Sequence, residues 1–126
     1  MKRFGFPKQA RLLHARDFDR VNAGGRRLIA HPLRVRALRR PEGGSRLGLA
    51  VSRRVGRAHL RNRWKRAIRE AFRLNRHRLQ RPYDLVVSVA WDASPEQIAA
   101  VGEAFLQIIE RLNADDGQAD GAAAGA

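Results

Sequence analysis

Apolar residues recur with a helical period in the middle of the chain. At about 100° per residue, the segment from Gly56 to about Leu79 divides into an apolar arc and an opposite basic face. The apolar arc contains Leu60, Trp64, Ala67, Ile68, Ala71, Phe72 and Leu74. The opposite face contains Asn62, Arg66, Arg69, Arg73 and Arg76, flanked by Arg63 and Lys65. The pattern predicts one long amphipathic helix, which ends before Pro82 because proline cannot continue a helix.

Three other stretches show the patterns of β-strands. The first runs from Leu28 to Arg39 and is interrupted at His31-Pro32, where proline favours a sheet edge or a strand start. The second runs from Leu47 to Ser52, and its large residues alternate with three small ones that would form a shallow floor: Gly48, Ala50 and Ser52. The third, Tyr83 to Trp91, is almost entirely apolar, which is typical of a central strand covered on both faces.

Shorter signals predict a helix before the strands and another after them. Residues 17–23 are predicted to be a short helix, with Asp17 as its cap and Gly24-Gly25 as its stop. A capping box at Ser94-Pro95-Glu96-Gln97 starts the last helix, and its apolar stripe runs to Leu112. Residues 1–13 are interpreted as a basic extended arm, and residues 114–126, rich in Ala and Gly, as a disordered tail. The folded domain is therefore expected at 1–113, as one sheet covered by helices on one side.

The charge distribution indicates what the basic helix binds. The chain has 126 residues and a net charge of +14, and residues 1–83 contain 25 of its 26 Lys and Arg residues with only 4 acids. Glu70 is the only acid between Arg53 and Arg81, so the arginines repel one another unless a partner neutralises them. Arginine outnumbers lysine 23 to 3, and guanidinium groups suit RNA because they bind phosphate and stack on bases. We therefore expect this face to bind nucleic acid rather than a membrane surface.

The residues that an autonomous enzyme would need are not grouped in this sequence. Cysteine is absent, which excludes disulfides and thiol chemistry and fits a cytoplasmic location. The four histidines are scattered, no serine lies in a nucleophile elbow, and the basic region has no carboxylate cluster for a metal. No apolar stretch approaches the roughly 20 residues that span a bilayer. We expect no catalytic residue and no metal ligand in this chain.

The segment from Arg46 to Glu70 resembles the signature of the protein subunit of bacterial ribonuclease P. That family has a strand ending in basic residues, then a glycine, then Arg-Asn-Arg-x-Lys-Arg-x-x-Arg, which corresponds here to Arg61, Asn62, Arg63, Lys65, Arg66 and Arg69. Arg11-Leu12 with Asp17-Phe18 and Val21 resembles the family's first helix region, and residues 84–89 resemble its last strand. The resemblance covers roughly residues 3–112.

The resemblance implies a fold and a function. The implied fold is α+β, a single-domain α/β sandwich of order αβββαβα whose basic helix lies in a left-handed βαβ crossover, although general rules favour a right-handed one. The implied function is that of an RNA-binding protein cofactor in an endoribonuclease whose RNA subunit is the catalyst. This holoenzyme removes the 5′ leader of precursor tRNA with Mg²⁺ that is bound mainly through RNA. The expected partners are the catalytic RNA, in a 1:1 complex, and precursor tRNA, and neither a membrane nor DNA is expected.

The resemblance also implies two binding surfaces. The residues expected to bind the RNA subunit are Arg53, Arg54, Arg57, Arg61, Asn62, Arg63, Lys65, Arg66, Arg69 and Arg73. The residues expected to line a cleft for the single-stranded leader are Phe18, Asn22, Arg34, Arg36, Gly48, Ala50 and Ser52. Asn22 and Arg36 stand where many relatives carry aromatic residues, which weakens the expectation of base stacking. Arg36 can still stack through its guanidinium group or bind phosphate.

Three other functions stay open from the residues themselves. A ribosomal or other general RNA-binding protein would share the basic helix but would not stimulate tRNA processing. A DNA-binding module that places a helix in the groove is disfavoured, because the arginine face follows a strand and the chain shows no dimer seam. A stand-alone protein nuclease is disfavoured because the basic region lacks a carboxylate cluster.

Overall fold

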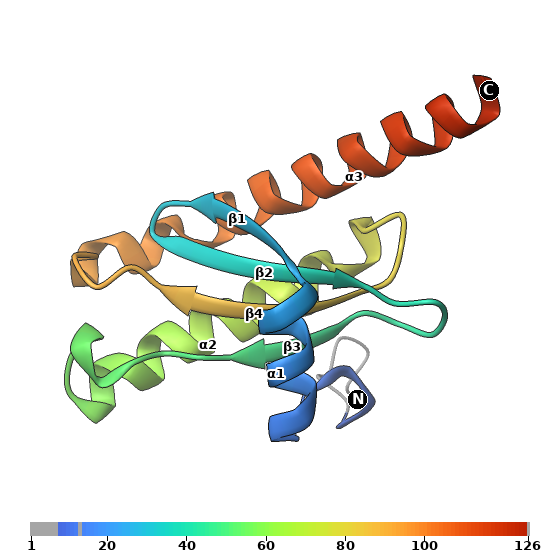
Figure 1. The fold of residues 1–126 in the computed structure, drawn as a ribbon. Helices are drawn as coiled ribbons and strands as arrows, with labels where there is room; N and C mark the ends of the chain where they lie inside the picture. The colour runs from blue at the N-terminus through green and yellow to red at the C-terminus, as the bar shows by residue number, and fades with distance from the viewer. Residues whose placement is uncertain (1–7, 13, 126) are drawn as a thin grey trace, which may run out of the picture.

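The computed structural model describes residues 8–12 and 14–125, and its side chains are described as far as Gly117. The helices are α1 (Ala15–Gly24), α2 (Ala58–Asn75) and α3 (Val101–Gly125). The strands are β1 (Arg26–Ala30), β2 (Leu33–Arg39), β3 (Arg46–Leu49) and β4 (Tyr83–Val89). Short 3-10 turns are η1 (Lys8–Ala10), η2 (Arg53–Val55), η3 (Arg76–Arg78) and η4 (Pro95–Ala100). This order of helices and strands confirms the expected αβββαβα arrangement (Figure 1).

The strands form one mixed sheet in the order β1-β2-β4-β3. The segment from Leu28 to Arg39 is a hairpin, since β1 and β2 are antiparallel neighbours on either side of the turn at His31-Pro32. β4 pairs with β2 antiparallel and with β3 parallel, so Val87 lies opposite Val35 on one side and Leu49 on the other. This pairing confirms that the nearly continuous apolar strand is central in the sheet. All its residues are buried except Ser88, which is half-buried.

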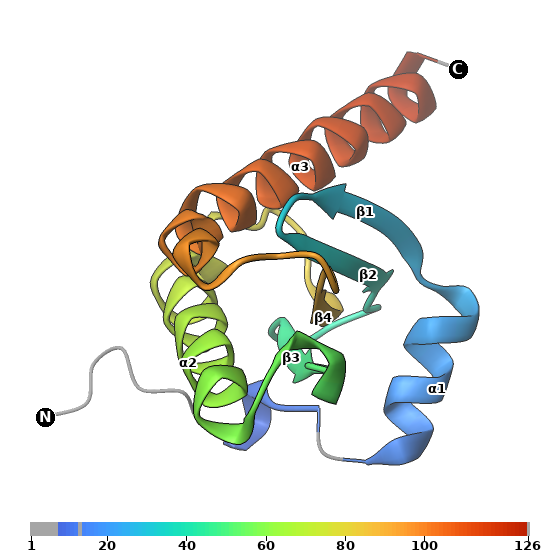
Figure 2. The same cartoon turned by 90° about the vertical axis from the view of Figure 1, so that its left-hand side faces the viewer.

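The basic helix α2 connects the parallel neighbours β3 and β4. In Figure 1, α2 lies behind the sheet, β4 lies above β3, and both strands run toward the same side. Figure 2 shows the same arrangement from the side, with α1 and α2 on opposite faces of the sheet. This geometry makes the crossover left-handed, as the resemblance implied and against the general rule.

The main core lies between the sheet and the two helices α2 and α3. The strands contribute alternate residues to it, such as Leu28, Val35 and Val87, each of which is 0–1% exposed. The helices contribute large side chains, and the rings of Phe72 and Phe105 meet edge to face with centroids 6.2 Å apart. Each such side chain contributes roughly 1.5–3 kcal/mol through its burial. Burial of the apolar arc therefore fixes the orientation of α2 about its own axis, and with it the face that points outward.

The helix α1 covers part of the opposite sheet face, so the expectation that helices cover one side only was wrong. Val21 of α1 is fully buried against Val86 of β4 and Leu12, and Phe18 and Leu38 pack beside them. Because α1 has only ten residues, it leaves the rest of that face uncovered.

The predicted beginning of the chain requires two corrections. α1 begins at Ala15 after His14, so Asp17 does not cap the helix but lies in its first turn, paired with Arg20 at 3.2 Å. Residues 8–12 are not a free arm, because the backbone N–H of Leu12 donates to the carbonyl of Leu47 at 2.9 Å and Ala10 and Leu12 are buried. The rest of the expected arm, residues 1–7 and 13, lies outside the described residues.

The ends of two helices also differ from their predicted positions. α2 ends at Asn75 and continues as η3, so the helix is shorter than the pattern suggested, and Leu74 is 45% exposed rather than in the core. α3 runs to Gly125, so the prediction of a disordered tail from residue 114 was wrong. Alanine is the strongest helix former, and this preference continues the helix through the Ala-rich segment. Within the described part of the chain, no helix combines the length and apolarity needed to cross a membrane.

Tertiary contacts extend the domain beyond the expected boundary at residue 113. Asp116 is buried and accepts hydrogen bonds from the hydroxyl of Tyr83 at 2.7 Å and from Arg39 at 3.4 Å. Asp115 forms an ion pair with Arg26 of β1. Burial and the nearby Asp116 raise the pKa of Tyr83 above its usual value. These contacts attach the first part of the expected tail to β1, β2 and β4.

Candidate nucleic-acid interface

The outward face of α2 forms the first candidate site. Trp64, Ile68 and Phe72 are fully buried, and the helical period therefore directs Arg63, Arg66 and Arg69 away from the core. Arg53 and Arg54 lie on η2, and Arg57 is the residue at the N-terminal cap of α2. We call the arginine surface the ten residues Arg53, Arg54, Arg57, Arg61, Asn62, Arg63, Lys65, Arg66, Arg69 and Arg73, of which Arg61, Lys65 and Arg73 are half-buried and the others exposed.

Almost nothing within the described residues neutralises this charge. Glu70 is the one acidic residue on α2, and it forms an ion pair with Arg73. The hydrogen bond between them raises the pKa of Arg73 and lowers that of Glu70. Arg63, Arg66 and Arg69 form no ion pair with any described residue, so their charge remains available to a polyanion.

The turn from η2 into α2 depends on Gly56. Its φ of +149° lies in the region that favours glycine, and a Cβ there would lie 2.6 Å from Cδ2 of Leu60. The hydroxyl of Ser52 accepts a hydrogen bond from the backbone N–H of Arg54 at 3.1 Å and thereby caps η2. The glycine and the serine together place the η2 arginines beside the first turn of the basic helix.

A second candidate site is a groove of about 450 Å³ on the sheet face that α1 leaves uncovered. Arg34 and Arg36 lie on the same face of β2 because strand residues two apart point the same way. Arg36 donates a hydrogen bond to the carbonyl of Asn22 at 3.3 Å and so links β2 to α1. The groove is lined by Asn22, Arg27, Ile29, Arg34, Arg36, Ala50, Val86 and Ser88. An apolar floor with arginines at its rim is suited to an unpaired nucleotide.

The seven residues expected in the leader cleft do not lie in one hollow. Asn22, Arg34, Arg36 and Ala50 line the groove. Ser52 is instead the cap of η2, as described above. Phe18 and Gly48 line or border a neighbouring hollow of about 510 Å³, described next.

Phe18 of α1 packs directly against Gly48 of β3. A Cβ at Gly48 would lie 2.7 Å from Cζ of Phe18, so the close approach of the ring requires a residue without a side chain. Phe18 shares this hollow with Lys65 and Arg69 of α2, which extend past the β3 edge of the sheet. The arginine surface and α1 therefore adjoin along β3.

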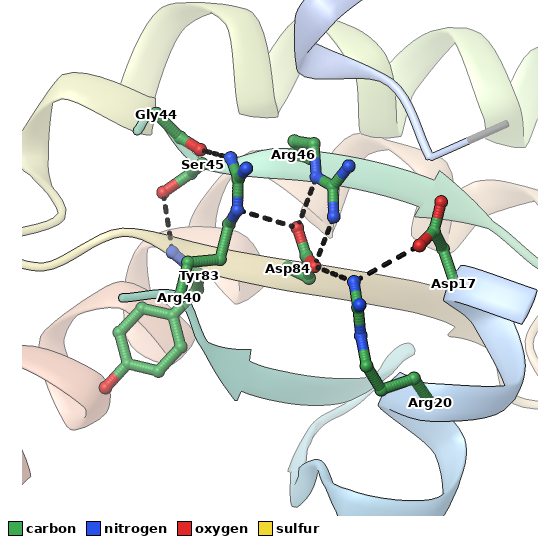
Figure 3. A network of polar contacts seen from close by, with 8 residues as sticks. All are labelled: Asp17, Arg20, Arg40, Gly44, Ser45, Arg46, Tyr83 and Asp84. Carbon is green, nitrogen blue, oxygen red and sulfur yellow. Dashed lines mark hydrogen bonds and ion pairs between the residues drawn. The ribbon is translucent and has the colours of Figure 1, made fainter. Parts of the chain in front are cut away.

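An ion network at the other end of this face holds α1 against the sheet (Figure 3). The carboxylate of Asp84, 1% exposed, accepts two hydrogen bonds from Arg46 at 2.7 Å each. Arg20 of α1 reaches the same carboxylate at 3.3 Å, and Arg40 lies 3.7 Å away. The hydrogen bonds to Asp84 raise the pKa of Arg46. Because Arg20 connects α1 to β4, the network helps to position the helix that forms one wall of the groove.

A Mg²⁺ site in a protein requires carboxylate and other oxygen ligands close together. Among the described residues, no group of three or more His, Cys, Asp or Glu side chains lies close enough to hold a metal ion. The two buried carboxylates of Asp84 and Asp116 already accept hydrogen bonds from Arg46 and Tyr83. The described part of this chain therefore does not fit a resident Mg²⁺ ion.

Comparison with known proteins identifies the family. The family model described as Ribonuclease P matches residues 6–113. The chain belongs to the ribonuclease P protein family. Similar relatives include the ribonuclease P protein component of Chlamydia trachomatis serovar L2, 36% identical over 113 residues that cover 89% of this chain and 93% of that protein. The component from Desulfotalea psychrophila is 40% identical over 106 residues, covering 81% and 88%.

Solved structures of ribonuclease P proteins share the fold. The protein from Thermotoga maritima superposes with a TM-score of 0.71 at 31% identity, covering 80% of this chain and 96% of that one. The protein from Staphylococcus aureus gives a TM-score of 0.67 at 32% identity, covering 79% and 94%. The resemblance read from the sequence is thus confirmed, and family membership gives the chain a role in tRNA processing as a component of an endoribonuclease complex.

Sequence reasoning missed the groove residues that come from β1 and β4 of this ribonuclease P protein. Arg27 and Ile29 of β1 and Val86 and Ser88 of β4 line the groove beside the predicted β2 residues. Their alternation was readable from the sequence, but the strand order that makes them neighbours of Arg34 was not. Trp91 was assigned to the central strand, whereas β4 ends at Val89 and the indole is exposed.

Proposed function

We propose that this chain is the RNA-binding protein cofactor of ribonuclease P, with the arginine surface binding the catalytic RNA subunit in a 1:1 complex. The observation that carries this proposal is the one-sided clustering on α2 of cations such as Arg63, Arg66 and Arg69, which form no ion pair with a described residue and lie opposite the buried side chains of the apolar arc. A rigid helix with cations at steps of three and four matches the regular phosphates of folded RNA, which offers shape and phosphate rather than base edges. Six to ten phosphate contacts would make affinity fall by roughly 10³–10⁵ between 50 and 200 mM salt on the duplex DNA scale.

The groove is proposed to bind the single-stranded 5′ leader of precursor tRNA. Unpaired nucleotides expose base faces that apolar residues such as Ile29 and Val86 can cover, while Arg34 and Arg36 contact the phosphates. Phe18, in the adjoining hollow beside Lys65, offers an aromatic ring at the point where the RNA strand would pass toward α2. The leader would thus lie next to the RNA subunit along the β3 edge.

Cleavage is proposed to use Mg²⁺ that is bound mainly through RNA. The protein's own contribution is electrostatic, because its cations reduce the repulsion between the phosphates of the precursor and those of the catalytic RNA. With less repulsion to overcome, the holoenzyme should assemble with its substrate at a lower Mg²⁺ concentration than the RNA alone. The chemical step is assigned to the RNA subunit, and the reaction is the endonucleolytic removal of the leader to give the mature 5′ end.

The decisive experiment is cleavage of a labelled precursor tRNA at low Mg²⁺. Three reactions are compared: bacterial ribonuclease P RNA alone, this protein alone, and both together. Efficient cleavage by the pair only is the expected result. If the protein binds RNA but does not change the cleavage rate, the cofactor role is overturned and a ribosomal or other general RNA-binding role takes its place.

Two variants separate the proposed surfaces in the same assay. Arg63→Ala should weaken assembly with the RNA subunit, because it removes an exposed cation of α2 that no described residue neutralises. Phe18→Ala should mainly weaken binding of the precursor to the assembled holoenzyme, because the ring lies on α1, the helix that also contributes Asn22 to the groove. Titrations in which neither variant differs from the wild type would refute the assignment of both surfaces.

A further inference from the structure

Trp91 is a large exposed aromatic residue that the proposed function has not used. It follows β4, which ends at Val89, and it is 56% exposed. The chain's other tryptophan, Trp64, is completely buried in the core. Single exposed apolar residues are common on protein surfaces, so the surroundings of the indole, and not its exposure alone, indicate whether it meets a partner.

The backbone holds Trp91 in a defined place at the end of the sheet. The N–H of Ala90 donates to the carbonyl of Pro32 at 3.0 Å, and Ala90 itself is 4% exposed. The N–H of Ala93 donates back to the carbonyl of Ala90 at 3.1 Å and closes the turn that carries the indole. The ring is therefore presented from the rigid end of β4, next to the β1–β2 turn.

Two guanidinium groups lie over the indole ring, and each belongs to a different binding surface. Cζ of Arg54 lies 4.2 Å from the ring centroid, within the range of a cation–π contact. Cζ of Arg34 lies 5.9 Å from the same centroid. Arg54 is part of the arginine surface and Arg34 lines the groove, so Trp91 lies where the two surfaces meet. Its surroundings are cationic rather than apolar, which suits an RNA strand better than an apolar protein face.

We propose that Trp91 is a stacking platform for an unpaired base of the precursor leader as the strand leaves the groove. The indole covers one base, and Arg34 and Arg54 contact the phosphates on either side of it. This platform supplies an aromatic contact that Asn22 and Arg36 do not offer. The proposal rests on the proposed function, because it extends the path of the leader beyond the groove.

The first test measures the intrinsic fluorescence of the full chain. Adding a single-stranded oligouridylate should quench the emission of Trp91, whereas buried Trp64 should respond little. In Trp91→Phe, which leaves Trp64 as the only tryptophan, most of the quenching should disappear. Equal quenching in the wild type and in Trp91→Phe would overturn the proposal.

The second test uses the reconstituted holoenzyme and a ladder of precursor tRNAs with leaders of increasing length. Removal of a stacking residue weakens binding by about 5- to 160-fold, and the lower end is expected for a half-exposed ring. The Trp91→Leu holoenzyme should bind the precursor more weakly by this factor once the leader is long enough to reach the indole. Trp91→Phe should retain most of the wild-type affinity. Leu74→Ala serves as a control at another exposed apolar residue. Mature tRNA should be bound equally by all variants.

The outcomes distinguish the two proposals. If the wild-type protein fails to stimulate cleavage, the proposed function fails whatever the variants do. If the wild type stimulates cleavage but Trp91→Leu matches it at every leader length, the stacking proposal alone is overturned. If Trp91→Leu loses the same affinity at every leader length, the indole contacts the RNA subunit instead of the leader, and the stacking proposal is overturned.

Discussion

Replacing Asp84 by asparagine tests the ion network that holds α1 against the sheet. The carboxylate is buried and accepts two hydrogen bonds from Arg46 and one from Arg20, with Arg40 nearby. Asparagine has nearly the same shape but no charge, and its NH₂ group would face guanidinium donors. The variant should therefore leave three arginines around a site that no longer neutralises them.

The expected cost follows from the burial of the partners. Breaking a buried ion pair by removing one partner costs about 3–5 kcal/mol. Water compensates part of this cost, because the side chains of Arg46, Arg40 and Arg20 are 20%, 25% and 56% exposed. We therefore expect Asp84→Asn to lower the free energy of unfolding by about 2–4 kcal/mol.

Urea denaturation followed by the fluorescence of buried Trp64 measures this change directly. The midpoint should fall while the slope m stays unchanged, since the variant alters stability and not the area exposed on unfolding. Asp92→Asn is the matched control, because it removes the same charge from an exposed carboxylate. A loss below about 1 kcal/mol, the range of a surface pair, would refute the view that this network is a structural clamp.

Further predictions address the binding surfaces and the α3 contact. Arg66→Ala should weaken assembly with the RNA subunit and reduce the slope of log affinity against log salt by about one. Arg73→Ala should weaken assembly less than Arg66→Ala, because Glu70 already pairs with Arg73. Equal losses of affinity for the two variants in a filter-binding assay would contradict this reasoning. Gly48→Val should displace the Phe18 ring and weaken precursor binding while leaving assembly intact, as separate titrations can show. The folded state raises the pKa of Tyr83, so the stability that this group contributes is complete below the unfolded pKa of about 10 and is lost as pH rises toward the folded pKa. Thermal unfolding from pH 8 to 11 should show this alkaline loss in the wild type but not in Tyr83→Phe.

The basic helix was predictable because the periodicity of apolar residues in an amphipathic helix shows which of its faces is buried and which is exposed. Trp64, Ile68 and Phe72 were assigned to the apolar arc and are buried in the core. The same holds for β4, whose continuous apolar run predicts a central strand and which lies between β2 and β3. In both cases the signal is local, so no knowledge of the tertiary arrangement was needed.

The candidate groove was only partly predictable. Arg34 and Arg36 were paired correctly by their alternation on one strand, and Asn22 and Ala50 came from the family resemblance. Arg27 and Ser88 come from β1 and β4, and they join the groove because β2 lies between those two strands. A strand's period reports which residues share a face but not which strand lies beside it.

The C-terminal segment was mispredicted because composition favoured two opposite outcomes. Polar and small residues from Ala114 onward suggested disorder, yet the alanines favour a helix once α3 has been nucleated. Asp115 and Asp116 then find partners on the sheet in Arg26 and Tyr83. Those partners are far away in sequence, so no local window could reveal them.

By itself, the sequence determined the type of the main secondary-structure elements and which of their faces are apolar. It predicted a basic amphipathic helix after a strand and a central apolar strand. It also showed a positive charge that favours binding to a polyanion. These properties follow from spacing and composition, which act over a few residues. Only the tertiary structure decided that β4 lies between β2 and β3, that α1 covers part of one sheet face, and that Arg34 and Arg54 both lie over the indole of Trp91. Such neighbours are chosen by the packing of the whole core, because the energy of each contact depends on chain segments that are distant in sequence.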